Sequence, residues 1–177
     1  MKLLKGYYAY LAVSVGLVLN LAVQGNWMLR IVAFALVSAG ALSVQSASRW
    51  YTRASIAADV CMAFSLVLGP AVIPAGLLRI VLQYASLVPL LLTGCMLLMG
   101  VREQMAKAGN GTAAEWAVLV LWSAGLILSL LAAPGWLNDY LMTVVTTVVN
   151  TLVPVGYVAL IVEMFRAQRI YLQTEEQ

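Results

Sequence analysis

The stretch from Ala54 to Val101 constrains the fold of this chain more than any other feature, because its only charged side chains are those of Asp59 and Arg79. As a single helix it would be about 70 Å long, more than twice the roughly 30 Å thickness of a bilayer's hydrocarbon core. The stretch must therefore fold back on itself. Two prolines and two glycines lie within Gly69–Gly76 and place the turn there.

The rest of the chain divides in the same way into apolar segments and short polar turns. A membrane-spanning helix needs about 20 mostly apolar residues, and we predict six of them, at about 7–24, 27–48, 54–73, 77–101, 112–133 and 136–164. They should form three helical hairpins in one bundle, 1–164, followed by a cytoplasmic helical tail, 165–177. The chain is 63% hydrophobic and 10% charged, whereas soluble domains are roughly 45–50% apolar and about 25% charged. The sequence therefore predicts an all-α polytopic membrane protein and excludes a soluble domain, a disordered chain and a nucleic-acid-binding module.

The basic residues are distributed unevenly between the two sides of this six-span plan. One side carries Lys2, Lys5, Arg49, Arg53, Arg102, Lys107, Arg166 and Arg169. The other side carries only Arg30 and Arg79. Because cytoplasmic loops are enriched in Lys and Arg, we expect a multi-pass protein of the cytoplasmic (plasma) membrane with both termini in the cytoplasm.

The candidate ligand site lies at the predicted outer end of the bundle. Arg30 and Arg79 stand about one turn inside their helices, and Gln83, Tyr84 and Asp139 are expected at a similar depth. A guanidinium binds a carboxylate or phosphate through two hydrogen bonds. We therefore expect one arginine to pair with Asp139 and the other to contact an anionic group of a small ligand. In the alternative, the arginines only reach lipid phosphates or pair with Asp139.

A polar stripe runs along the last span and consists of Thr143, Thr147 and Thr151, with Thr146, Asn150 and Pro154 beside them. Lipid offers Asn150 no hydrogen-bond partner, so the stripe is predicted to face the centre of the bundle. Pro154 frees a backbone carbonyl near Asn150, where a kink or a binding notch is expected. In the alternative, the stripe only joins neighbouring helices.

The sequence gives little support for catalysis. The chain has no histidine, and the predicted middle of each span is free of Asp, Glu, Lys and Arg. Cys61 and Cys95 lie apart in separate apolar segments, which disfavours a metal site. There is also no phosphate-binding loop of the form GxxxxGK[ST]. We expect no enzymatic activity, no metal and no cofactor.

Two functions stay open from the sequence. In the first, the protein binds or translocates a small solute, with an anionic one favoured, as the membrane-embedded subunit of a larger transporter. Alternatively, it is a membrane sensor, assembly or regulatory subunit that signals through its C-terminal cytoplasmic helix. A structural subunit without a ligand is a third interpretation. The expected partners are the lipid bilayer, a small-molecule ligand and a cytoplasmic or membrane protein that docks at Arg49, Arg53, Arg102, Arg166 and Arg169. No nucleic-acid partner is expected.

Overall fold

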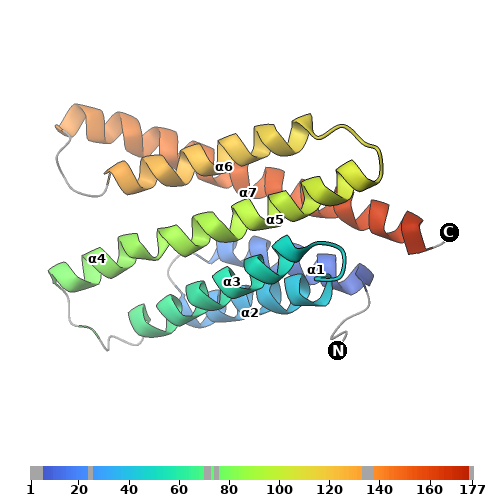
Figure 1. Cartoon of the computed structure of the whole chain (residues 1–177). Coiled ribbons are helices and arrows are strands. Elements are labelled where there is room, and N and C mark those ends of the chain that lie inside the picture. Colours follow the sequence, from blue (N-terminus) through green and yellow to red (C-terminus); the bar gives the residue numbers. More distant parts are fainter. Residues whose placement is uncertain (1–5, 24–25, 70–72, 74–75, 133–137, 176–177) are drawn as a thin grey trace.

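The computed structural model describes residues 6–23, 26–69, 73, 76–132 and 138–175, and nearly all of these are helical. The helices are α1 (Gly6–Ala22), α2 (Trp27–Ser43), α3 (Arg49–Leu68), α4 (Leu77–Ala85), α5 (Leu87–Lys107), α6 (Ala113–Ala132) and α7 (Asp139–Glu175). Figure 1 shows them as an elongated bundle with both chain ends on the same side. We call that side the terminal end and the opposite side, where the helices turn back, the hairpin end.

The lengths and hydropathy of the helices confirm a polytopic helical membrane protein. Four helical segments are long and apolar enough to cross a membrane, namely Arg49–Leu68, Leu77–Lys107, Ala113–Ala132 and Asp139–Gln173. The apolar helices α1 and α2 are shorter, at 17 residues each. The chain runs up and down three times, as the three-hairpin plan predicts (Figure 1). The turns predicted at Gly25, Pro70, Pro74 and Pro134 lie outside the described residues.

The predicted fourth span is realised as two helices with an interruption at Ser86. The hydroxyl of Ser86 donates to the carbonyl of Gln83 at 2.6 Å, and Pro89, which follows closely in α5, has no backbone N–H to donate to the preceding turn. Beyond the interruption, α5 continues past the predicted end at Val101 as far as Lys107. The polar residues from Arg102 to Lys107 therefore belong to the helix and not to a loop.

The last helix is continuous from Asp139 to Glu175, and Pro154 does not end it. It also runs through the predicted boundary between bundle and tail at residue 164. Ala167 and Gln168, beyond that boundary, are buried, and the ring of Tyr171 lies 5.8 Å from that of Tyr10 on α1. This part of α7 therefore packs against the bundle.

Helix α1 is much shorter than α7 and lies against only the terminal half of it. At 1.5 Å per residue, α1 is about 25 Å long and α7 about 55 Å. The amide of Asn20, near the end of α1, donates to the hydroxyl of Tyr157, and Gly6, at its start, lies against the ring of Tyr171. Asp139 is then about 27 Å farther along α7 than Tyr157. The α1–α2 hairpin consequently ends short of α4, α6 and α7 at the hairpin end (Figure 1).

This difference in length determines where the core lies. Among the described side chains of α7, every buried one lies at Gly156 or beyond, and those between Asp139 and Val155 are exposed or half-buried. The hydrophobic core is accordingly concentrated where α1, α2, α3, α5, the middle of α6 and the second half of α7 meet. At the hairpin end, the short α1–α2 pair leaves space between the longer helices.

Candidate functional site

The space above the α1–α2 hairpin contains a large cavity of about 570 Å³. Five helices contribute to its wall, which consists of Asn20, Arg30, Leu87, Leu90, Leu126, Ser129, Val149, Asn150, Val153, Pro154 and Tyr157. The amides of Asn20 and Asn150, the guanidinium of Arg30 and the hydroxyl of Tyr157 give this wall both hydrogen-bond donors and acceptors. The large cavity is therefore suited to a polar solute.

A small cavity of about 150 Å³ lies next to the large one and shares Arg30 with it. Its wall consists of Trp27, Arg30, Ser65, Leu68, Gly69, Arg79 and Gln83. Two guanidinium groups and one amide thus meet around a small volume. The shared arginine makes the two cavities parts of one crevice.

Local features of the chain place both arginines at the crevice. The side chain of Asn26 accepts hydrogen bonds from the N–H groups of Met28 and Leu29 at 3.1 and 3.3 Å, which fixes the first turn of α2. Arg30 follows one turn later and is half-buried. Across the small cavity, Arg79 donates to the carbonyl of Leu68, at the end of α3, at 3.4 Å.

Gly69 allows the ring of Trp27 to pack closely at the edge of the small cavity. A Cβ atom at Gly69 would lie 2.3 Å from Trp27, closer than atoms can approach. Any larger residue at this position would therefore displace the indole ring. Trp27, which starts α2, and Gly69, which follows α3, together hold the two helices against each other beside Arg30.

The positive charges of the crevice have no acidic partner in the described part of the chain. The ion pairs found there are Lys107 with Glu103 and Arg166 with both Glu115 and Glu163. All of them lie toward the terminal end. A charge that is removed from water without a partner costs free energy, and two like charges around one cavity add repulsion. An anion in the crevice would relieve both.

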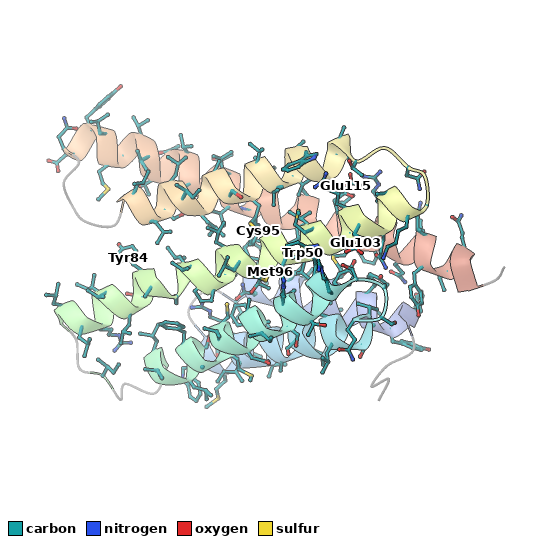
Figure 2. All side chains as sticks on the ribbon, in the orientation of Figure 1. Trp50, Tyr84, Cys95, Met96, Glu103 and Glu115 are labelled. Atoms are coloured by element: carbon teal, nitrogen blue, oxygen red, sulfur yellow. The ribbon has the colours of Figure 1, made fainter. Side chains whose placement is uncertain are left out.

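The structure brings together some of the predicted site residues and separates others. Arg30, Arg79 and Gln83 line the small cavity as a group, and Asn150 lines the large cavity with Arg30. Tyr84, on α4, is half-buried and lines neither cavity (Figure 2).

The predicted pairing of an arginine with Asp139 is wrong. Asp139 is exposed at the start of α7, and its side chain forms no ion pair within the described residues. It lies about 16 Å along the helix from Asn150, whereas Arg30 lines the large cavity together with Asn150. The prediction assumed that all outer helix ends lie at one depth, and the short α1–α2 hairpin breaks that assumption.

The prediction for the polar stripe is also wrong for its threonines. Thr143, Thr147 and Thr151 are exposed and do not face the bundle centre. Each hydroxyl donates to the carbonyl four residues earlier in α7, at 2.8, 2.8 and 3.0 Å. Since these hydroxyls are satisfied within their own helix, they need no partner from another helix. Asn150 is exposed as well, but it opens into the large cavity.

Asn20, Trp27 and Tyr157 are among the crevice residues that sequence reasoning missed. Asn20 was a detectable candidate, because an amide inside an apolar helix needs a partner that lipid cannot supply. Trp27 was recognisable as an interfacial aromatic residue, but nothing in the sequence connects it with Gly69. Tyr157 carries no signal of its own, since its role depends on α1 ending beside it.

The charged and polar groups that line the crevice are guanidinium groups, amides and hydroxyls. Neither cavity is lined by a histidine, a cysteine or a carboxylate, and the described residues contain no group of three or more His, Cys, Asp or Glu that could hold a metal ion. No known family model matches the chain, and no curated protein or solved structure is significantly similar to it.

Proposed function

We propose that this protein binds a small anionic solute in the crevice at the hairpin end and takes part in its transport across the membrane. The observation that carries the proposal is the position of Arg30, which lines both cavities. Arg79 lines the small cavity with it, and neither arginine has an acidic partner in the described part of the chain. A carboxylate or phosphate group fits the donors that two guanidinium groups present.

The size and the polar groups of the crevice support a solute of modest dimensions. Ligand pockets commonly enclose about 300–1,000 Å³, and the large cavity, at about 570 Å³, falls in this range. Asn20, Asn150 and Tyr157 offer hydrogen bonds to the uncharged part of such a solute. Pro154 has no N–H to donate to the carbonyl of Asn150, four residues earlier in the helix. That carbonyl is therefore a further acceptor for the solute.

The proposal includes an orientation in the plasma membrane with both termini in the cytoplasm. Arg49, Arg53, Arg102, Arg166 and Arg169 all belong to the terminal end, which is the pattern of a cytoplasmic face. The crevice then opens to the outside, and the solute enters from there. In a larger transporter, this chain would be the membrane-embedded subunit that recognises the solute, and the proposal assigns it no catalytic step.

Arginine substitutions in the purified full-length chain test the proposal. Inorganic phosphate, sulfate and succinate serve as probes, and their binding is measured by thermal stabilisation and calorimetry. We expect Arg30→Gln to weaken binding of the best probe about tenfold, because a hydrogen bond to a charged group contributes roughly 1.5–3 kcal/mol. Arg79→Gln should act in the same direction.

The matched control is Asp139→Asn, which changes an exposed charge at the hairpin end but lies outside both cavities. It should leave probe binding unchanged. Equal affinities of the wild type, Arg30→Gln and Arg79→Gln for every probe would overturn the proposal.

A second function, as a sensor or assembly subunit, is favoured by the continuity of α7. This helix passes the large cavity at Asn150 and Tyr157 and continues without a break to Glu175 at the terminal end. A rigid helix can transmit a displacement at the crevice to a cytoplasmic partner. Co-purification from native membranes separates the two functions: an associated ATPase supports transport, whereas an associated kinase or cell-envelope complex supports sensing or assembly.

A further inference from the structure

We propose a second binding site, at the terminal end, for the headgroup of an anionic phospholipid. A cavity of about 390 Å³ lies between the start of α3, the end of α5 and the segment that leads into α6. Its wall consists of Arg49, Trp50, Met99, Arg102, Glu103, Ala106 and Thr112. We call it the headgroup cavity. It shares no residue with the crevice, so this site stands or falls independently of the proposed function.

Arg102 is held in an orientation that leaves its donors free. Its guanidinium carbon lies 4.5 Å from the centre of the Trp116 ring on α6, in a cation–π contact. Stacking uses the flat face of a guanidinium, whereas hydrogen bonds leave from its edge. Arg102 can therefore stay on Trp116 and still donate to a phosphate in the headgroup cavity.

The acidic residue in the wall of the headgroup cavity forms its ion pair with a lysine and not with either arginine. Glu103 accepts a hydrogen bond from Ser48 at 2.6 Å and forms an ion pair with Lys107 at 2.8 Å. Within the described residues, Arg49 and Arg102 have no ion pair. Figure 2 shows Trp50 on α3 and Glu103 on α5 at this end of the bundle. The cavity thus combines two arginines that form no ion pair in the described part of the chain with a carboxylate that already binds Ser48 and Lys107.

The start of α3 reinforces this positive charge. Ser48 caps the helix by accepting from the N–H of Trp50 at 3.2 Å, and Arg49 is the first helical residue. The N-terminus of a 20-residue helix carries the positive end of the helix dipole. Backbone and side chains therefore favour an anion at the same place.

The surrounding aromatic residues favour a lipid over a free phosphate. Trp116 is 46% exposed, and Arg53 stacks over Trp50 at 4.6 Å from the ring centre. Trp residues at a helix end with basic partners are typical of the level of lipid headgroups. If the terminal end is cytoplasmic, it also faces the leaflet in which anionic lipids are abundant. A phospholipid phosphate at this level reaches Arg49 and Arg102 while its acyl chains stay in the bilayer.

Lipid titrations of the full-length chain in detergent test this site. Phosphatidylglycerol is compared with phosphatidylcholine by thermal stabilisation and by native mass spectrometry of retained lipid. We expect selective retention of phosphatidylglycerol by the wild type and about tenfold weaker binding by Arg49→Gln/Arg102→Gln. Arg169→Gln is the matched control, because it removes an exposed positive charge at the same end, outside the headgroup cavity.

Three outcomes would overturn the inference. The first is that the wild type shows no preference for phosphatidylglycerol. The second is that Arg169→Gln loses as much lipid as the double variant. The third is that inorganic phosphate stabilises the wild type as well as the lipid does, which would make this a site for soluble phosphate. The comparison of phosphatidylglycerol with phosphatidylcholine on the wild type tests the lipid preference even if the double variant does not fold. Binding of probes at the crevice is expected to stay intact in the double variant.

Discussion

Arg166 is the residue on which the charge balance of the terminal end depends. Its Nη1 atom donates to both carboxylate oxygens of Glu163 at 2.8 Å and lies 3.5 Å from an oxygen of Glu115. Glu163 and Glu115 are 4% and 1% exposed. The oxygens of Glu115 have no hydrogen-bond partner among the described residues. Two buried carboxylates from α6 and α7 therefore share one guanidinium.

We predict that Arg166→Gln destabilises the protein strongly, because it leaves two buried carboxylates without a counter-charge. Breaking a buried ion pair by removing one partner costs about 3–5 kcal/mol, and we expect a loss of about 3 kcal/mol, because Arg166 is itself partly exposed. Denaturant unfolding in detergent micelles, followed by circular dichroism, measures the loss. Arg169→Gln should change the stability little.

A second substitution shows whether the loss of stability comes from the missing positive charge or from lost side-chain packing. Arg166→Gln/Glu115→Gln removes one of the two orphaned carboxylates and should recover part of the lost stability. If the double variant is no more stable than Arg166→Gln alone, the effect does not come from uncompensated charge.

Residue by residue, the sequence predicted the charges of the site better than its geometry. Arg30 and Arg79 were identifiable because charged side chains are rare in apolar helices, and their meeting follows from the hairpins. The threonines of α7 were misjudged because a hydroxyl can bond within its own helix, which a pattern of spacing does not reveal. The sequence could not show that Glu115 and Glu163 share Arg166, since the two glutamates lie on different helices.

Among the elements, α1 and α2 approach each other closely, and glycines make this approach possible. A Cβ atom at Gly16 of α1 would lie 2.5 Å from the carbonyl oxygen of Ala33, and one at Gly40 of α2 would lie 2.5 Å from that of Ala9. The two contacts are reciprocal, as expected for an antiparallel pair. Small residues allow such backbone contact in membranes, where the hydrophobic effect does not drive helix association.

We predict that Gly40→Ala lowers the stability of the protein by about 2 kcal/mol, because the added methyl group meets backbone and must push the helices apart. Thermal unfolding in detergent checks this value. Gly111→Ala is the control, because a Cβ atom there has no neighbour within 4 Å. Equal stability of Gly40→Ala and the control would contradict the close α1–α2 contact.

At the level of elements the sequence was a good guide, because the length of an apolar run and its Gly and Pro breaks are local properties. It located the hairpins and the return within residues 54–101. It did not foresee that α7 continues through the proposed tail boundary, since burial of Ala167 and Gln168 depends on α1 lying beside them.

For the whole molecule, the decisive feature is the unequal reach of the helices toward the hairpin end. Run lengths show how long each helix is, but not how far it is shifted along its neighbours. The bond between Asn20 and Tyr157 fixes that shift. It moves Arg30 to the level of the middle of α7, where the sequence had predicted no charge.

Cysteine labelling of intact cells tests this arrangement and the orientation together. In a background of Cys61→Ser and Cys95→Ser, we predict that Tyr140→Cys reacts rapidly with a membrane-impermeant thiol reagent added outside. Asn26→Cys should react more slowly, because Asn26 caps the short helix α2 one turn before Arg30, which lines the crevice. Gly111→Cys should react only after permeabilisation. Equal rates at positions 26 and 140 would contradict the shift, and external labelling at position 111 would contradict the orientation.

The short α1–α2 hairpin also has an electrical consequence. In the proposed orientation, an ion that reaches Arg30 from the hairpin end would travel through part of the bilayer's thickness, and so through part of the membrane voltage. One elementary charge that crosses the entire field gains or loses about 2.3 kcal/mol per 100 mV. If the crevice binds an anion as proposed, its occupancy should vary with voltage, and the resting potential of the cell would adjust how tightly that anion is held.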